Sequence, residues 1–242
     1  MDAEDAIKER RSIRKYKDAP LDWDKVTRIL EAGRYAPSAG NLQTVKFLVI
    51  LDEAQRKRIA EISHNQNWMA EAPVHIIVCA EEGRTAKFYS DRGERLYSVQ
   101  NAAAAIENML ICASALNVGS CWVGAFDEDE LKDEFGIPGD VRPQAIITLG
   151  YADEVTPRPQ KYDLQIFCFL DRYGNRIGDM DKLLGDYSLI TERNIKEVKE
   201  YLEKKVPKAV ETAKEFGKEA KKAVREKIKK KLLGIRKEGD LP

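Results

Sequence analysis

Hydrophobic and polar residues between positions 1 and 152 follow two alternating patterns. Short apolar runs are typical of strands buried on both faces, whereas apolar residues three or four positions apart predict helices. Because the two patterns alternate, the fold class is α/β or α+β. The predicted strands are 45–51, 73–80, 120–126 and 143–152, and the predicted helices are 2–8, 22–33, 53–63, 95–117 and 127–135.

Two of these helices carry further signals. Asp22 is a suitable N-cap for the second helix, and Gly33 and Pro37 mark its end. The helix over 95–117 is apolar or alanine on nearly every face, so we expect it in the centre of the fold. After Pro159 the pattern is irregular, and 166–177 indicates a strand and a turn. The apolar face of the second helix comprises Trp23, Val26, Ile29 and Leu30.

The composition is that of a globular chain. Its 242 residues are 43% hydrophobic, enough for a sizeable core, and the formal net charge is zero. No apolar run reaches the roughly 18–20 residues that span a bilayer, and the acidic N-terminus does not resemble a signal peptide. We therefore expect a soluble, cytoplasmic protein.

The zero net charge hides an acidic body and a basic tail. Residues 191–242 contain 17 Lys and Arg against 10 Asp and Glu, whereas residues 1–190 contain 24 against 31. We predict a domain over 1–190 and an amphipathic helical tail over 191–242. The apolar stripe of the tail would pack on the body or a partner subunit, lie on an anionic membrane, or belong to a free solvated helix. Nucleic acid is disfavoured, because the tail lacks interleaved aromatic residues. The stripe comprises Ala209, Ala213, Phe216, Ala220, Val224, Ile228 and Leu232.

Reactive side chains are few. Of the two histidines, His75 lies in a strand-like run and is expected in the core, whereas His64 lies in a polar turn. No Ser-His-Asp set, histidine-rich metal set, G-x-G-x-x-G or Walker loop is present in the sequence. If the chain is an enzyme, a bound organic cofactor carries its chemistry. The cysteines match no disulfide or zinc pattern and are expected to be reduced core thiols: Cys79, Cys112, Cys121 and Cys168.

The stretch ERRSIRKY, residues 9–16, concentrates cations and a hydroxyl near the start of the chain. Arginine's planar fork matches phosphate oxygens, so this stretch suits a phosphate group. A solvated basic face is the alternative, and it fits the stretch alone equally well.

Five motifs, in order along the chain, resemble those of a known family. They are RRSIRKY, APSAGNLQ, an asparagine before EAPVHIIV, NAAAAIENMLICASALNVGSCWVGAFD, and ITLGYADE. From Asp5 to Asp171 the chain thereby resembles the FMN-dependent nitroreductase family. The resemblance implies an α+β fold, with a mixed, mainly antiparallel sheet flanked by helices. It also implies an intertwined homodimer with FMN sites at the interface.

The resemblance further assigns residues to FMN. Arg10, Arg11 and Ser12 would hold the phosphate and ribityl end. Arg14 would reach the isoalloxazine ring near N1 and the C2 carbonyl, where a cation stabilises negative charge. The loop APSAGNLQ would come from the partner subunit and help to close the site, a plain helix-to-strand loop being the alternative. Its candidate residues are Pro37, Ser38, Asn41 and Gln43.

Three more positions complete the implied site. Asn65, with Asn67 as its rival, would serve the pyrimidine edge of the flavin, because an amide both donates and accepts. Gly124 and Ala125 would bring backbone N–H groups close to N5 and the C4 carbonyl. A basic residue late in the chain would contact the phosphate, although Gln160 stands where the family often has a second arginine. The candidates are Arg158 and Lys161.

The implied reaction is a ping-pong transfer. NAD(P)H would pass a hydride to flavin N5 and leave, and an electron-poor acceptor such as a nitroaromatic, a quinone or another flavin would take its place. No protein acid or base is needed, which agrees with the scarcity of histidine. One alternative is a relative that fragments its own flavin or dehalogenates halotyrosines, with a lid at 84–98. Another is a flavin-binding module without turnover.

Overall fold

The computed structural model describes residues 1–176, 196 and 226. The chain divides into two units, Met1–Pro159 and Gln160–Pro242. The predicted domain boundary at 190 falls outside the described residues, and of the predicted tail only residues 196 and 226 are described, so both remain predictions.

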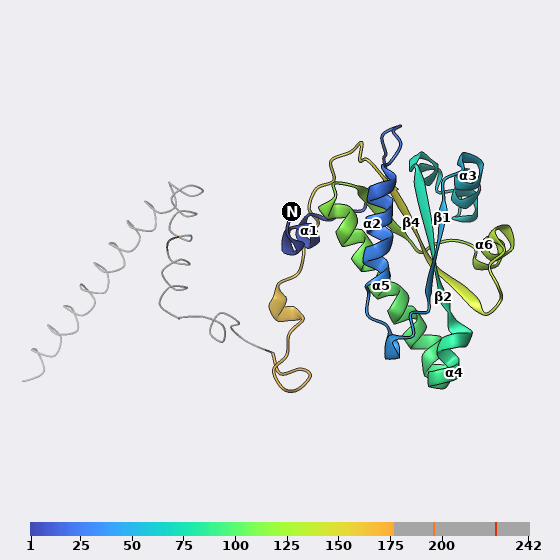
Figure 1. Cartoon of the computed structure of the whole chain (residues 1–242). Helices are drawn as coiled ribbons and strands as arrows, with labels where there is room; N and C mark the ends of the chain where they lie inside the picture. Colours follow the sequence, from blue (N-terminus) through green and yellow to red (C-terminus); the bar gives the residue numbers. More distant parts are fainter. Residues whose placement is uncertain (177–195, 197–225, 227–242) are drawn as a thin grey trace, which may run out of the picture. The chain divides into compact units, whose positions relative to one another are not determined.

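The first unit is a sheet with helices on both faces (Figure 1). The strands are β1 (Val45–Ile50), β2 (Val74–Glu81), β3 (Gly119–Val123) and β4 (Val141–Gly150). The α-helices are α1 (Ala3–Glu9), α2 (Trp23–Arg34), α3 (Glu53–Ile62), α4 (Glu82–Arg92), α5 (Ser98–Ala115) and α6 (Glu128–Phe135). Short helical turns are η1 (Ala39–Asn41), η2 (Asn67–Glu71) and the π-helical η3 (Gly93–Tyr97), with η4 (Leu164–Ile166) in the second unit.

The strand order is β1-β2-β4-β3, and each neighbouring pair is antiparallel. Ser12 adds an isolated parallel bridge to Ser120, so the basic segment of the sequence runs beside β3. The prediction of a mainly antiparallel sheet flanked by helices is confirmed for the described residues, and the class is α+β rather than α/β.

The two largest clusters of the described core lie one on each face of the sheet. α2 and α5 cover one face, where Ile76 of β2 and Met109 of α5 are fully buried. α3 and α6 cover the other face, where Ile77 and Leu131 are fully buried. Successive β2 side chains therefore enter opposite cores, which explains why this strand reads as a continuous apolar run.

Gly33 lies one residue before the end of α2 and also has a packing role that the sequence did not show. This glycine lies inside α2, which continues to Arg34. A Cβ at this position would lie 2.8 Å from Met109 Sδ and 2.8 Å from Phe47 Cζ. The glycine is therefore needed for the close approach of α2 to α5 and β1. Trp23, assigned to the apolar face, is 56% exposed, whereas Val26 and Ile29 are fully buried.

The second unit begins with irregular backbone. Its predicted strand and turn at 166–177 is only partly present, because Ile166 ends the turn η4. Phe169 and Arg176 then pair in one antiparallel bridge. No helix among the described residues is long and apolar enough to cross a membrane.

Candidate functional site

The basic segment is held between α1 and β3. The backbone N–H of Arg10 caps α1 by donating to the Ala6 carbonyl, and the backbone N–H of Ile13 donates to the Ser120 carbonyl over 2.9 Å. Residues 10–13 thus cross from the end of a helix to the edge of a sheet, which fixes their backbone at both ends.

A cavity of about 540 Å³ opens beside this segment. Its wall is formed by Arg10 and Arg11, by the start of β3 and by residues 152 and 154–156. Arg11 Nη1 donates to the carbonyls of Lys8 and Arg10, each over 2.9 Å, whereas Arg11 Nε is buried and has no partner in the part of the chain that the structure describes. Thr156 Oγ1, in the same wall, is also buried without a partner among the described residues. Buried donors normally have acceptors, so two unused donors around one cavity fit an acceptor-rich group such as a phosphate.

Arg14 forms a second part of the site, and it follows the cavity residues Arg10 and Arg11 closely in the sequence. Its backbone N–H donates to Glu154 Oε1 over 2.6 Å, and the N–H of Lys15 donates to the same oxygen over 3.1 Å. The Arg14 guanidinium carbon is 5.8 Å from the centroid of the Trp68 ring, within the range of a cation–π interaction. Glu154 fixes the backbone and Trp68 contacts the side chain, so the cation is held toward η2.

The residues assigned to the flavin ring lie near η2, the short helical turn that contains Trp68. Gln66 Nε2 donates to the Ala125 carbonyl over 3.3 Å, which joins the segment of Asn65 to the end of β3. Asn65 is exposed and has a left-handed backbone, with φ of 59°. Gly124 is exposed, and the nearest atom to a Cβ there would be Trp122 Nε1 at 3.8 Å. The protein itself leaves this backbone open to a ligand. Asn67 begins η2 nearby, so the choice between Asn65 and Asn67 stays open.

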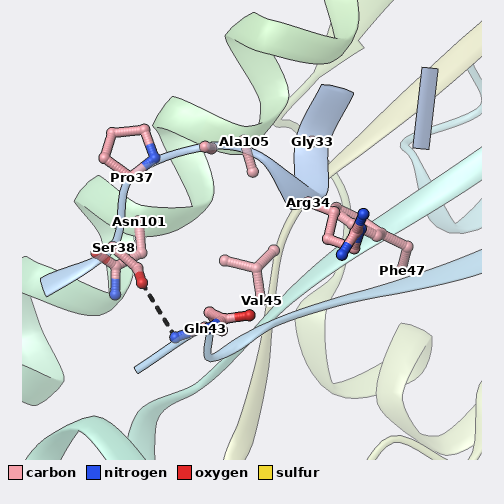
Figure 2. Close-up of a pocket in the computed structure, with 10 residues that line it drawn as sticks. Gly33, Arg34, Pro37, Ser38, Gln43, Val45, Phe47, Asn101 and Ala105 are labelled. Atoms are coloured by element: carbon pink, nitrogen blue, oxygen red, sulfur yellow. Dashed lines mark hydrogen bonds between the residues drawn. The ribbon is translucent and has the colours of Figure 1, made fainter. Parts of the chain in front are cut away.

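The loop 37–43 lines a different and smaller cavity of about 120 Å³ (Figure 2). Ser38 Oγ accepts from the Gln43 backbone N–H over 3.0 Å, and Asn101 Oδ1 accepts from the Ala39 N–H over 2.9 Å. The φ angles of Gly40, Asn41 and Gln43 are all near 50°. Within one chain the structure does not place this loop in the cavity of Arg10 and Arg11. The exposed side chains of Asn41 and Gln43 contact each other instead, with Gln43 Nε2 and Asn41 Oδ1 3.3 Å apart.

Arg158 and Lys161 stand on either side of the division between the two units, and both are exposed. Arg158 follows Thr156 by two positions and therefore comes soon after the wall of the larger cavity. Lys161 belongs to the second unit.

The segment 84–98, where a lid was expected, is helical but irregular. Ser90 inside α4 has φ of 51° and ψ of −145°, and π-helical η3 follows. Phe88 is 66% exposed. A Cβ at Gly40 would overlap the Tyr89 hydroxyl, so α4 rests on the loop 37–43.

The buried titratable groups do not act as acid or base near neutral pH. Burial lowers the pKa of His75 to about 4, and the ring donates from Nε2 to the Met69 carbonyl over 2.8 Å. Burial raises the pKa of Cys79 to about 12 and also raises that of Cys121. His75, Cys79 and Cys121 are therefore core groups, as predicted, whereas Cys112 and Cys168 are only partly buried. All four thiols are free, and the described residues contain no group of three metal-ligating side chains.

Sequence reasoning missed three residues of the site: Trp68, Glu154 and Thr156. Trp68 and Glu154 contact Arg14, which is far away along the chain, and Thr156 shares a cavity wall with the equally distant Arg10 and Arg11. Glu154 is the last residue of the motif ITLGYADE, and Thr156 follows it by two positions. This position along the chain is the one sequence signal that pointed to them.

The fold and the site together define an α+β protein with a cavity lined by two arginines and, nearby, a cation held over an aromatic ring. A model of the nitroreductase family matches residues 7–68 and 63–151. The chain belongs to the nitroreductase family, and the predicted nitroreductase-like fold is confirmed.

The names of individual relatives agree with this family assignment. A protein of Archaeoglobus fulgidus, provisionally named NADH dehydrogenase/NAD(P)H nitroreductase, is 34% identical over 146 residues, which are 59% of this chain and 80% of the relative. The FMN reductase [NAD(P)H] of Bacillus subtilis is 27% identical over 169 residues, covering 64% of this chain and 68% of the relative. The structure of an NADH oxidase, also provisionally named, from Clostridium acetobutylicum has 30% identity and a TM-score of 0.61, covering 69% and 99% of the two chains.

Proposed function

We propose that this protein is an FMN-dependent oxidoreductase that uses NAD(P)H as its electron donor. Relatives named as FMN reductase and as NAD(P)H nitroreductase support the reaction class. The observation that carries the proposal is the cavity at the basic motif, where Arg11 Nε and Thr156 Oγ1 are buried donors that have no acceptor within residues 1–176. A phosphate end bound there would satisfy both donors.

The remaining residues fit the rest of the cofactor. Arg10, Arg11 and Ser12 would hold the phosphate and ribityl chain, and Arg14, fixed by Glu154 and Trp68, would meet the ring. The open backbone at Gly124 and Ala125 would donate hydrogen bonds to the other ring edge. Asn65 or Asn67 would serve the pyrimidine edge. Arg158 or Lys161 would add a cation to the phosphate.

Bound FMN would supply the redox chemistry, taking a hydride from NAD(P)H and passing electrons to a nitroaromatic, quinone or flavin acceptor in a separate half-reaction. The protein's part is to bind, orient and polarise. Arg14 provides positive charge, and the buried His75 and Cys121 stay neutral near pH 7 because burial opposes their ionisation.

We expect the full-length protein to purify with FMN and to oxidise NAD(P)H faster when a quinone is added. Ping-pong kinetics predict parallel double-reciprocal lines when donor and acceptor are both varied. Identifying the released flavin by chromatography and measuring initial rates would check this. A protein that takes up no FMN on titration contradicts the proposal. FMN binding without NAD(P)H oxidation would indicate a module without turnover.

We further propose a homodimer in which the loop 37–43 of one subunit closes the flavin site of the other. Support comes from the loop's separation from the larger cavity within one chain and from its strained backbone, which Asn101 holds in place. Residues held at unfavourable φ angles are common where a loop serves a ligand.

Subunit mixing tests this arrangement. Arg14→Ala and Asn41→Ala would each damage both sites of a homodimer. In a mixed dimer, one site would combine an intact Arg14 with an intact loop, so we expect activity in the mixture above that of either variant alone. Sedimentation should show a dimer. A stable monomer that binds FMN, or a mixture no more active than its parents, counts against the shared site.

A further inference from the structure

Backbone hydrogen bonds between two distant segments of the chain place Thr156 at the cavity. The segment after β4 runs antiparallel to the segment after Arg14, with a bridge between Tyr16 and Ala152. The Lys17 N–H donates to the Tyr151 carbonyl over 2.8 Å, and the Asp153 N–H donates to the Lys15 carbonyl over 3.0 Å. The next residues, 154–156, form part of the cavity wall, so the position of Thr156 follows from this pairing.

The Thr156 hydroxyl differs from another hydroxyl in the same wall. Ser114 Oγ donates to the Ala6 carbonyl over 3.0 Å and so needs no ligand. Thr156 Oγ1 is buried and has no hydrogen-bond partner among the described residues. Arg11 Nε, in the same wall, is also buried and also lacks a partner among those residues. Leaving a buried donor unpaired costs free energy, which an acceptor bound between the two would recover.

The charges in the wall explain why a neutral donor is useful there. Arg10 and Arg11 share the wall with the carboxylates of Glu9 and Glu154. Glu154 Oε1 is occupied by the N–H groups of Arg14 and Lys15. A hydroxyl adds a hydrogen bond to a dianion without adding charge, and hydrogen bonds to ionised acceptors are the stronger ones.

We infer that the Thr156 hydroxyl is a ligand of the flavin phosphate and that, with Arg11 Nε, it makes the cavity select FMN over riboflavin. This rests on the proposed function. Riboflavin has the same ring and ribityl chain but ends in a hydroxyl, so it would leave at least one of the two buried donors unpaired.

The test compares Thr156→Val with Thr156→Ser in the full-length protein after its flavin has been removed. Valine has nearly the shape of threonine without the hydroxyl, and serine keeps the hydroxyl. We expect Thr156→Val to bind FMN about tenfold more weakly and to bind riboflavin as the wild type does. Thr156→Ser should stay close to the wild type for both ligands. Ser114→Ala, in the same wall, should leave the ratio of the two affinities unchanged.

A melting experiment separates ligand binding from a structural role. Because Thr156→Val removes an unpaired buried hydroxyl, the flavin-free variant should melt at the wild-type temperature or above it, while added FMN should raise its melting temperature less. Equal losses for FMN and riboflavin, an unchanged FMN affinity, or a lower melting temperature without flavin would each overturn the inference. A wild-type chain that binds neither ligand would instead refute the proposed function itself.

Discussion

Replacing Arg14 by alanine is expected to weaken FMN binding about tenfold to a hundredfold, because a hydrogen bond to a charged group contributes about 1.5–3 kcal/mol. Arg14 is positioned for such a contact by two separate features. Glu154 Oε1 accepts from its backbone N–H over 2.6 Å, and its guanidinium lies 5.8 Å from the Trp68 ring centroid. Quenching of flavin fluorescence gives the dissociation constant directly.

Two further variants sharpen this result. Arg14→Lys keeps the charge but loses the planar fork, so it should recover only part of the affinity. Arg28→Ala removes an exposed arginine on α2 whose nearest carboxylate, of Asp24, is 4.0 Å away, and it should bind FMN as the wild type does. If Arg14→Ala binds FMN within twofold of the wild type, Arg14 does not contact the cofactor.

The second large effect concerns acid stability. Burial lowers the pKa of His75 from 6.5 to about 4; the hydrogen bond to the Met69 carbonyl opposes this shift and the nearby Arg56 adds to it. In the unfolded chain the imidazole takes up a proton near pH 6.5, whereas in the folded chain it stays neutral until about pH 4. Stability from this group is therefore complete above pH 6.5 and is lost as the pH falls toward 4.

We expect the free energy of unfolding to fall by about 2–3 kcal/mol between pH 7 and pH 4.5 because of His75 alone. His75→Gln keeps an N–H donor but does not titrate. The fall in its free energy of unfolding between pH 7 and pH 4.5 should therefore be smaller than that of the wild type by this amount. Urea unfolding at fixed protein concentration measures the difference. His64→Gln is the matched control, because His64 is exposed in a turn and is the only other histidine of the chain. Identical pH profiles for His75→Gln and the wild type would contradict the expectation.

Elements with local causes could be predicted from the sequence. The helix predicted over 127–135 is α6, in which the Asp127 carboxylate accepts from the Glu130 N–H over 2.9 Å and Gly136 ends the helix at φ of 62°. Each of these signals acts within a few residues. The continuous burial of β2, whose successive side chains enter opposite cores, is likewise a property of consecutive side chains.

Contacts between distant residues could not be predicted in this way. The sequence pattern placed Gly33 within one residue of the end of α2, but it could not show that Met109 and Phe47 pack against this glycine. The wall that holds Thr156 likewise depends on a ladder between segments some 136 positions apart, as between Tyr16 and Ala152. No pattern within a short window carries that information.

The sequence alone therefore determined the strands and the helices other than α4, the burial of His75 and the basic motif, because propensity, capping and amphipathic spacing act over a few residues. Only the tertiary structure decided which of the motif's neighbours share its cavity. It placed Arg11 and Thr156 in the wall of one cavity, bound the backbone of Arg14 to Glu154 and set its side chain over Trp68. The physical reason is that a binding site is made by side chains that the sheet and its packed helices bring together, whatever their separation along the chain.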